Sequence, residues 1–371
     1  MITNRFKKPQ VDLILTLVTF ALVGFGLIML SSVSSVISFE NFGNPNTYLY
    51  KQLVFAAMGI AAWFVAQKID YHFWKKIALP LFVISFVLTA AVFIPGVGFH
   101  YNGATRWINL GFTLFQPSEV LKLSIILYAA TYFDTHRKDV NSFKRTFIPF
   151  CVLIILTAAM MLKQPDLGTF LVIGSVSIAM YFVAGLRLTY IASVLGIGGI
   201  GILIMIKKST YRMQRLLVFL DPEKDPLGIG FHVNQALIAV GSGGFWGRGF
   251  GKSGQKYTGY IPEAAGDSAF AIIAEELGFL KIVAMPILLF TLFAWRGYTI
   301  ANKCTDYFGK LVAFGITSWV IFQAILNIST MVALAPLTGV PLPFISNGGT
   351  SLVMILFASG ILLNVSKYQN K

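Results

Sequence analysis

The sharpest candidate for chemistry in this sequence is a carboxylate that stands where a polar segment meets an apolar run. The segment Pro262-Glu263-Ala264-Ala265-Gly266-Asp267-Ser268 closes a long basic, glycine-rich stretch, and the residues after it predict an apolar helix. Asp267 at this helix start could be an N-cap that accepts backbone N–H groups. It could equally be a general base or a metal ligand, because it lies at the boundary between polar and apolar surroundings.

A pair of charges stands near the start of another apolar run. Glu119 and Lys122 are three residues apart and therefore share one face of a helix. They could form an internal ion pair, or they could line a polar cavity and adjust the electrostatic field inside it. Asp166 follows Lys163 and Pro165 in a tight turn, where it could cap the next helix or contact a substrate.

Arg106 lies beside Trp107 in a connection flanked by glycines. It could anchor the chain at a membrane interface, and its guanidinium is also well shaped to grip a pyrophosphate. The four histidines and two cysteines are scattered, and their spacing predicts neither a zinc site nor a disulfide framework.

Nine of the fifteen acidic residues lie in, or directly beside, connections that we assign below to the outer face of a membrane. Ionisable groups at membrane depth cost at least a few kcal/mol, so they are expected to be paired or functional. These nine residues are Glu119, Asp166, Asp221, Glu223, Asp225, Glu263, Asp267, Glu275 and Glu276.

The elements that must position these side chains are membrane helices. Of the 371 residues, 56% are hydrophobic and 12% are charged, whereas a soluble domain carries about 25% charged residues. Much of the surface must therefore face lipid. Apolar runs long enough to cross a bilayer lie near 11–34, 50–67, 77–95, 118–134, 146–162, 168–185, 187–206, 268–295, 309–333 and 348–366.

The distribution of basic residues predicts the orientation of these spans. Basic clusters around residues 5–8, 68–76 and 137–145 fall in alternate connections, and the short connections between them are poorer in Lys and Arg. The positive-inside rule then places both termini in the cytoplasm and the long 207–267 segment outside. The net charge of +14 thus encodes topology, since the basic residues do not form the stripe with interleaved aromatics that nucleic-acid binding requires.

We therefore predict an all-α fold, a polytopic bundle of about ten transmembrane helices that forms a single membrane domain over residues 1–371. The segment 207–267 is predicted to be a large extracytoplasmic loop before the eighth helix. It is too apolar for disorder, so we expect it to pack on the bundle. We find no internal repeat of the kind that marks many transporters.

Taken together, these segments resemble the SEDS family of cell-wall polymerases (shape, elongation, division and sporulation), and the resemblance runs in order from about residue 10 to residue 366. The matching stretches are Gly103-Ala104-Thr105-Arg106-Trp107-Ile108, Gln116-Pro117-Ser118-Glu119, Gln164-Pro165-Asp166-Leu167-Gly168-Thr169, Phe219-Leu220-Asp221-Pro222 with Asp225-Pro226, Gly241-Ser242-Gly243-Gly244, Pro262-Glu263 through Asp267, Glu275-Glu276-Leu277-Gly278, and Pro341-Leu342-Pro343-Phe344-Ile345-Ser346 followed by Gly348-Gly349.

The resemblance implies a peptidoglycan glycosyltransferase of the bacterial cytoplasmic membrane that acts on lipid II, the undecaprenyl-linked disaccharide-pentapeptide. It also implies that Asp267, the aspartate after the Pro-Glu motif, is the key acid. Residues 251–256 are closer to the division member FtsW than to RodA. Two departures from the family concern the surroundings of this acid. Ala265 and Gly266 stand where family members often have His-Thr, and Asn347 stands where an aromatic residue is common.

Polymerisation of lipid II into a β-1,4 strand inverts the anomeric centre, so one step requires an activated acceptor hydroxyl. We expect Asp267 to be the general base or to bind a divalent cation, Mg²⁺ or Mn²⁺, beside it. Cationic side chains would stabilise the leaving pyrophosphate, and other polar residues would contact the substrate. The candidate cations are Arg106, Lys122, Arg212 and Arg215, and the further contacts are Glu119, Lys163, Asp166, Gln235, Ser242 and Glu263.

The expected partner is a single-pass class B penicillin-binding protein, the transpeptidase that crosslinks the strands, with other membrane proteins of the division or elongation machinery. Two alternatives remain open from the sequence. A multi-span protein with buried charges could move lipid II across the bilayer, or it could act as a scaffold for that machinery.

Overall fold

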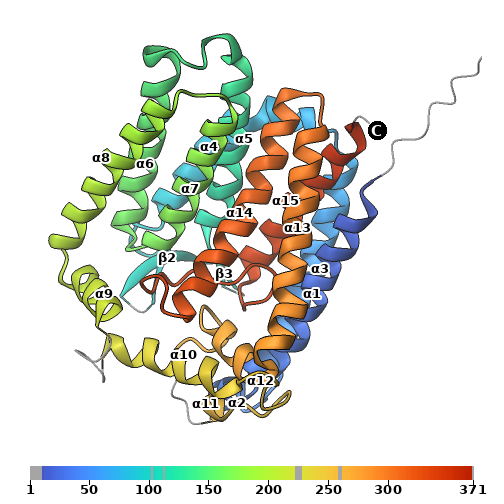
Figure 1. Ribbon diagram of the computed structural model, residues 1–371, viewed down its shortest axis with the longest axis vertical. Helices are drawn as coiled ribbons and strands as arrows, with labels where there is room; N and C mark the ends of the chain where they lie inside the picture. The colour runs from blue at the N-terminus through green and yellow to red at the C-terminus, as the bar shows by residue number, and fades with distance from the viewer. Residues whose placement is uncertain (1–10, 102, 112, 222–227, 258–260, 370–371) are drawn as a thin grey trace, which may run out of the picture.

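The computed structural model describes residues 11–101, 103–111, 113–221, 228–257 and 261–369, which form a helical bundle with one small sheet (Figure 1). All ten predicted apolar runs are helical, which confirms the all-α class. Their backbone groups bond within each helix, as a lipid environment demands. The corresponding helices are α1 (Leu13–Val33), α3 (Thr47–Lys68), α4 (Tyr71–Ala91), α5 (Pro117–Thr135), α6 (Ile148–Lys163), α7 (Leu167–Val183), α8 (Leu188–Lys207), α12 (Ala269–Ile282) with α13 (Leu288–Lys303), α14 (Tyr307–Met331) and α15 (Gly349–Val365).

Eight of the described helices are long and apolar enough to cross a membrane. Two of the predicted spans are less simple. Helix α7 has 17 residues, and α5 carries Glu119 and Lys122 in its first turns. Both pack against α14, so they lie inside the bundle, and the predicted count of about ten spans holds as an approximate one.

The prediction of one continuous span over 268–295 is wrong, because the chain breaks at Gly278. This glycine has φ 74° and ψ 172°, and a Cβ there would lie 2.1 Å from the backbone nitrogen of Gly247. Segment 244–249 satisfies the backbone groups that the break leaves open. The Arg248 N–H, for example, donates to the Glu275 carbonyl at 2.9 Å. The membrane-crossing helix therefore runs from Ala284 to Lys303, and the first part of α12 is a separate buried piece.

The connection that carries Arg106 is a small antiparallel sheet, which the sequence patterns did not predict. It contains β1 (Gly98–Tyr101), β2 (Ala104–Asn109) and β3 (Leu114–Phe115) in that order. Strand β3 leads directly into α5. Strand β2, which carries Arg106, therefore packs against the helix that holds Glu119.

The long segment 207–267 is largely helical and lies at the end of the bundle opposite the C-terminus (Figure 1). It contains α9 (Thr210–Leu220), α10 (Ile229–Gly243) and α11 (Gly254–Tyr257), and α10 packs against α12 as well as α9. Short helix α2 (Ser35–Phe42) lies at the same end. The acids predicted at 223 and 225 lie outside the described residues.

Both ends of the described chain meet at the other end of the bundle (Figure 1). The backbone N–H of Asp12 donates to the Ser366 hydroxyl at 3.1 Å, and the backbones of Cys304 and Gln369 form an isolated antiparallel β-bridge. This agrees with an even number of crossings. That this end is the cytoplasmic one stays a prediction from the loop charges, part of which, at residues 5–8, lies outside the described residues.

Candidate active site

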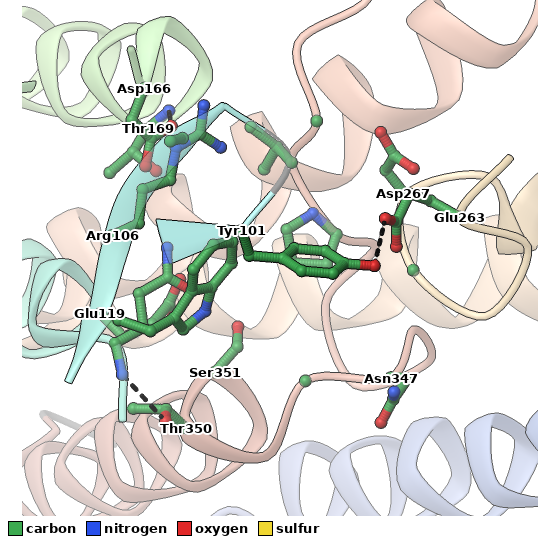
Figure 2. A pocket seen from close by; sticks show the side chains of 18 of the residues that line it. Tyr101, Arg106, Glu119, Asp166, Thr169, Glu263, Asp267, Asn347, Thr350 and Ser351 are labelled. Atoms are coloured by element: carbon green, nitrogen blue, oxygen red, sulfur yellow. Dashed lines mark hydrogen bonds between the residues drawn. The ribbon is translucent and has the colours of Figure 1, made fainter. Parts of the chain in front are cut away.

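A polar cavity of about 420 Å³ opens at the end of the bundle that holds the sheet and the long segment. Its walls come from the sheet, the starts of α5 and α7, helices α9 and α10, the 262–267 loop, and the 337–351 segment. Figure 2 shows Arg106, Glu119 and Asp166 on one side and Glu263 and Asp267 on the other. Residues more than a hundred positions apart thus meet in one space.

Seven of the eleven predicted site residues line this cavity and four do not. The seven are Arg106, Glu119, Lys122, Asp166, Arg215, Glu263 and Asp267. The side chains of Lys163, Arg212 and Ser242 have contacts elsewhere: the Lys163 ammonium lies 4.5 Å from the centre of the Phe93 ring, Arg212 donates to the Leu162 carbonyl, and Ser242 donates to the Ala239 carbonyl. Gln235 is half-buried on α10 and is also absent from the cavity lining.

Asp267 is half-buried in the loop directly before α12. The Ser268 hydroxyl lies 3.4 Å from Oδ1 of its carboxylate, and the Asn327 amide donates to its backbone carbonyl at 2.8 Å. Burial raises the pKa of this carboxyl to about 6, and the positive charge of Arg215 works against that rise. A carboxyl with a pKa near neutrality can both take and release a proton under physiological conditions.

The Glu119 and Lys122 pair fits both interpretations left open by the sequence. The two charges are 2.9 Å apart and almost fully buried, yet both residues line the cavity. Lys122 also donates to the Gln323 side chain at 2.8 Å and lies 5.1 Å from the centre of the Trp319 ring. Its charge is therefore largely satisfied within the protein.

Arg106 and Asp166 stabilise the wall of the cavity that lies across from Asp267. The Arg106 guanidinium donates to the backbone carbonyls of Gln164 (3.2 Å) and Pro165, which ties β2 to the turn before α7. Asp166 accepts the backbone N–H of Thr169 at 3.1 Å and so caps α7, as one interpretation predicted. Asp166 nevertheless lines the cavity, so capping does not remove it from the site.

Sequence reasoning missed several residues that hold the site. His232 on α10 lines the cavity, and its Nε2 lies 2.6 Å from the Ser268 hydroxyl. Tyr101 on β1 reaches across the cavity and donates to Glu263 at 3.2 Å (Figure 2). Gln323 and Asn327 lie four residues apart on α14, and polar residues repeated on one face of a membrane helix are a signal that could have identified them.

The two departures from the family pattern lie at the acid itself. Asn347 lines the cavity, and its backbone N–H donates to the Ala265 carbonyl at 2.8 Å. A Cβ at Gly266 would come within 3.3 Å of the Glu263 carbonyl oxygen. The loop is therefore closely packed where it turns, and these two positions support the backbone next to Asp267.

Comparisons with known proteins agree along the whole chain. A family model described as a cell cycle protein and named for FtsW, RodA and SpoVE matches residues 13–371. The chain is 41% identical to Stage V sporulation protein E of Bacillus subtilis (strain 168), with 98% of each chain covered. It is 40% identical to a protein of Trichlorobacter lovleyi named "Probable peptidoglycan glycosyltransferase FtsW", with 99% of this chain and 96% of that protein covered.

Among solved structures, one described under "Structural coordination of polymerization and crosslinking by a peptidoglycan synthase complex" contains a chain with the same fold. The TM-score is 0.80 at 27% sequence identity, and the match covers 97% of this chain and 99% of that chain.

Proposed function

The chain belongs to the FtsW, RodA and SpoVE family of cell cycle proteins, and we propose that it is a peptidoglycan glycosyltransferase that polymerises lipid II into β-1,4 glycan strands. The observation that carries the proposal is the position of Asp267. A carboxyl with a raised pKa lines a polar cavity at the end of a membrane bundle, where a lipid-anchored sugar can present its head group. The nearly equal identities, 41% to Stage V sporulation protein E and 40% to the relative named FtsW, leave the division role a prediction.

Asp267 acts as the general base in a single displacement. Its carboxylate takes the proton of the acceptor hydroxyl as the hydroxyl oxygen bonds to the anomeric carbon. The bond from that carbon to the pyrophosphate breaks, and the undecaprenyl pyrophosphate leaves with the electron pair. A positioned base of this kind contributes about 10²–10⁴-fold to a rate.

Arg215 is the best placed cation for the charge that develops on the leaving group. It lines the cavity, and its charge is close enough to Asp267 to lower the pKa of that carboxyl. Lys122 is less available, since it is paired with Glu119 and bonded to Gln323. Arg212 is absent from the cavity lining and donates to the Leu162 carbonyl, so Arg215 is the better candidate of the two for the pyrophosphate.

A divalent cation fits this site only if the substrate supplies some of its ligands. No group of three or more His, Cys, Asp or Glu side chains that could hold an ion exists among the described residues. Glu263 and Asp267 both line the cavity, and Mg²⁺ is commonly held by one or two carboxylates together with substrate phosphates. These two residues would hold such an ion against the pyrophosphate, and its contribution would be charge neutralisation there.

The proposed partner is a class B penicillin-binding protein. The related structure is described as a peptidoglycan synthase complex that coordinates polymerization and crosslinking. Crosslinking is transpeptidase chemistry, and we assign no such chemistry to the described residues of the cavity, so a partner would supply it. We further propose that the termini face the cytoplasm and that the cavity faces the outside, where lipid II and other division or elongation proteins are accessible.

The test uses the full-length protein in proteoliposomes with lipid II and a divalent cation. We expect wild-type protein to produce glycan strands and Asp267→Ala to produce none while it remains folded in the membrane. A flipping assay on the same vesicles separates the alternative function. Transfer of lipid II across the bilayer without polymer would favour a transporter, and polymer from Asp267→Ala would rule out the assigned base.

A further inference from the structure

We propose that His232 is a positioning residue for this reaction, which holds the Ser268 hydroxyl and so fixes the loop that presents Asp267. The inference rests on the proposed function. The loop consists of residues 262–268, between the long segment and α12. His232 belongs to a different element, α10, which packs against α12.

The Ser268 hydroxyl is the centre of the contacts that close this loop. Its oxygen lies 2.8 Å from the Pro262 carbonyl, 2.6 Å from His232 Nε2 and 3.4 Å from Asp267 Oδ1. One hydroxyl therefore joins the first residue of the loop to the last and links both to α10. Asp267 is its immediate chain neighbour, so movement of Ser268 moves the carboxylate.

The proton count assigns the roles within this cluster. A serine hydroxyl carries one proton and can donate only once. The Pro262 carbonyl oxygen can only accept, so its 2.8 Å contact needs the serine proton, whereas the imidazole at 2.6 Å can supply a proton of its own. We therefore infer that the serine proton goes to Pro262 and that the serine oxygen accepts from His232. The imidazole must then carry its proton on Nε2. Ser268 is fully buried, so the loss of this donor cannot be replaced by bulk water.

The charges around His232 are consistent with a fixed neutral donor. Burial and the positive charge of Arg215 together lower the pKa of His232 to about 4, against the opposing effect of the negative charge of Glu263. The imidazole is therefore neutral at pH 7 and keeps a single N–H for Ser268. Its contribution to the reaction is the geometry of the loop, with no proton transfer of its own.

The loop needs such a contact because its backbone is strained. Glu263 has φ 49°, a left-handed conformation that a residue with a side chain adopts at a cost of about 1–3 kcal/mol, and such conformations persist when surrounding contacts enforce them. The side-chain amide of Asn327 donates to the Asp267 carbonyl, and the backbone N–H of Asn347 donates to the Ala265 carbonyl, so both hold backbone atoms of the loop. The His232 contact adds a hold on the Ser268 side chain.

The experiment compares substitutions that keep or remove the donor. His232→Leu removes the N–H, whereas His232→Gln can supply an amide N–H from a similar reach. In the lipid II polymerisation assay with the full-length protein we expect His232→Leu to lower kcat about 10- to 100-fold with KM within about threefold, because small misplacements of a catalytic group have effects of this size. His232→Gln should recover most of the loss.

Ser268→Ala gives a second route to the same contact. It should lower kcat to a similar extent, and the double variant Ser268→Ala with His232→Leu should show little further loss. His136→Leu, at the other end of the bundle, is the matched control and should have wild-type activity. Each variant is checked for a wild-type Tm, and Ser268→Ala keeps the inference testable if His232→Leu does not fold.

Two results would overturn the inference. Wild-type kcat for His232→Leu or Ser268→Ala would show that the loop does not depend on this contact. A His232→Gln variant as impaired as His232→Leu would show that the imidazole itself is required. Failure of the proposed function looks different, since the wild-type protein would then make no glycan from lipid II.

Discussion

The first piece of α12, which ends at the Gly278 break, has acids in contrasting surroundings at its two ends, with Asp267 just before it and Glu275 and Glu276 near its end. At its C-terminal end Glu276 accepts from Lys256 at 2.8 Å and from the Ser32 hydroxyl at 2.6 and 2.8 Å. Glu275 accepts from the Ser253 hydroxyl at 2.5 Å and pairs with Arg248 at 3.0 Å. Both glutamates are fully buried. These acids are saturated with partners.

At the N-terminal end the situation is reversed. Asp267 lines an open cavity, and the Ser268 hydroxyl that lies 3.4 Å from its carboxylate has a closer acceptor in Pro262. Burial raises the pKa of Asp267 to about 6, although the positive charge of Arg215 and hydrogen bonds from Asp267 and Ser268 themselves work against the rise. The difference shows that carboxylates on, or next to, one helix can have two roles, one in stability and one in catalysis. The buried and paired acids Glu275 and Glu276 fix α1, α11 and the 244–255 segment in place, whereas Asp267 lines the cavity and is available for chemistry.

The largest effect expected from this comparison is that of Asp267→Asn. The substitution removes the base, so polymerisation should fall by about 10²–10⁴-fold. It also removes a poorly solvated charge, so the Tm should stay the same or rise. The paired readout is glycan synthesis from lipid II and thermal unfolding of the same purified sample. A Tm well below that of the wild type would place Asp267 with the structural acids instead.

The opposite pattern is expected at the other end of the helix. Lys256→Met leaves Glu276 buried without its cation, which should lower the free energy of unfolding by about 3–5 kcal/mol. Adding Glu276→Leu removes the remaining charge and should restore part of that loss. Thermal unfolding of the two variants in one detergent measures both steps. If the double variant were less stable than Lys256→Met, the stability would not depend on the unpaired charge.

A smaller effect is expected for Arg248→Ala. This side chain pairs with Glu275 but is 48% exposed, so solvent screens the pair. Glu275 also keeps its bonds from Ser253 and Gly254 at 2.5 and 3.0 Å. The substitution should change the free energy of unfolding by about 0–1 kcal/mol. A loss as large as that of Lys256→Met would mean that the two glutamates are not independently held.

Much of the fold could be predicted from the sequence because the signals are local. Long apolar runs predict helices, and all ten runs are helical. The break at Gly278 could not be predicted, since a glycine in an apolar pattern is a weak signal and the apolar pattern continues on both sides. What stabilises the break is segment 244–249, some thirty residues earlier, through backbone bonds that no local pattern contains.

The candidate site divides in the same way. Short motifs with an acid or a guanidinium, such as those of Asp166, Asp267 and Arg106, could be identified and do line the cavity. His232 could not, because a lone histidine on a helix has no motif and its importance depends on the distant Ser268. Ser242 and Gln235 are absent from the cavity lining for the converse reason, since a glycine-rich motif or a polar residue in the right segment does not fix the direction of a side chain.

The pH dependence of polymerisation tests the central claim most directly. Because the raised pKa belongs to the free protein, the quantity to measure is kcat/KM for lipid II from about pH 5 to about pH 8, at constant divalent cation. A base must be ionised, so we predict that kcat/KM rises with pH and has a midpoint near 6. The contribution of Asp267 to stability should change in the opposite direction. It is fully present below the ordinary pKa of 3.8 and is lost as the pH rises through about 6. A kcat/KM that is flat across this range, or that falls as the pH rises through 6, would contradict the assignment of Asp267 as the catalytic base.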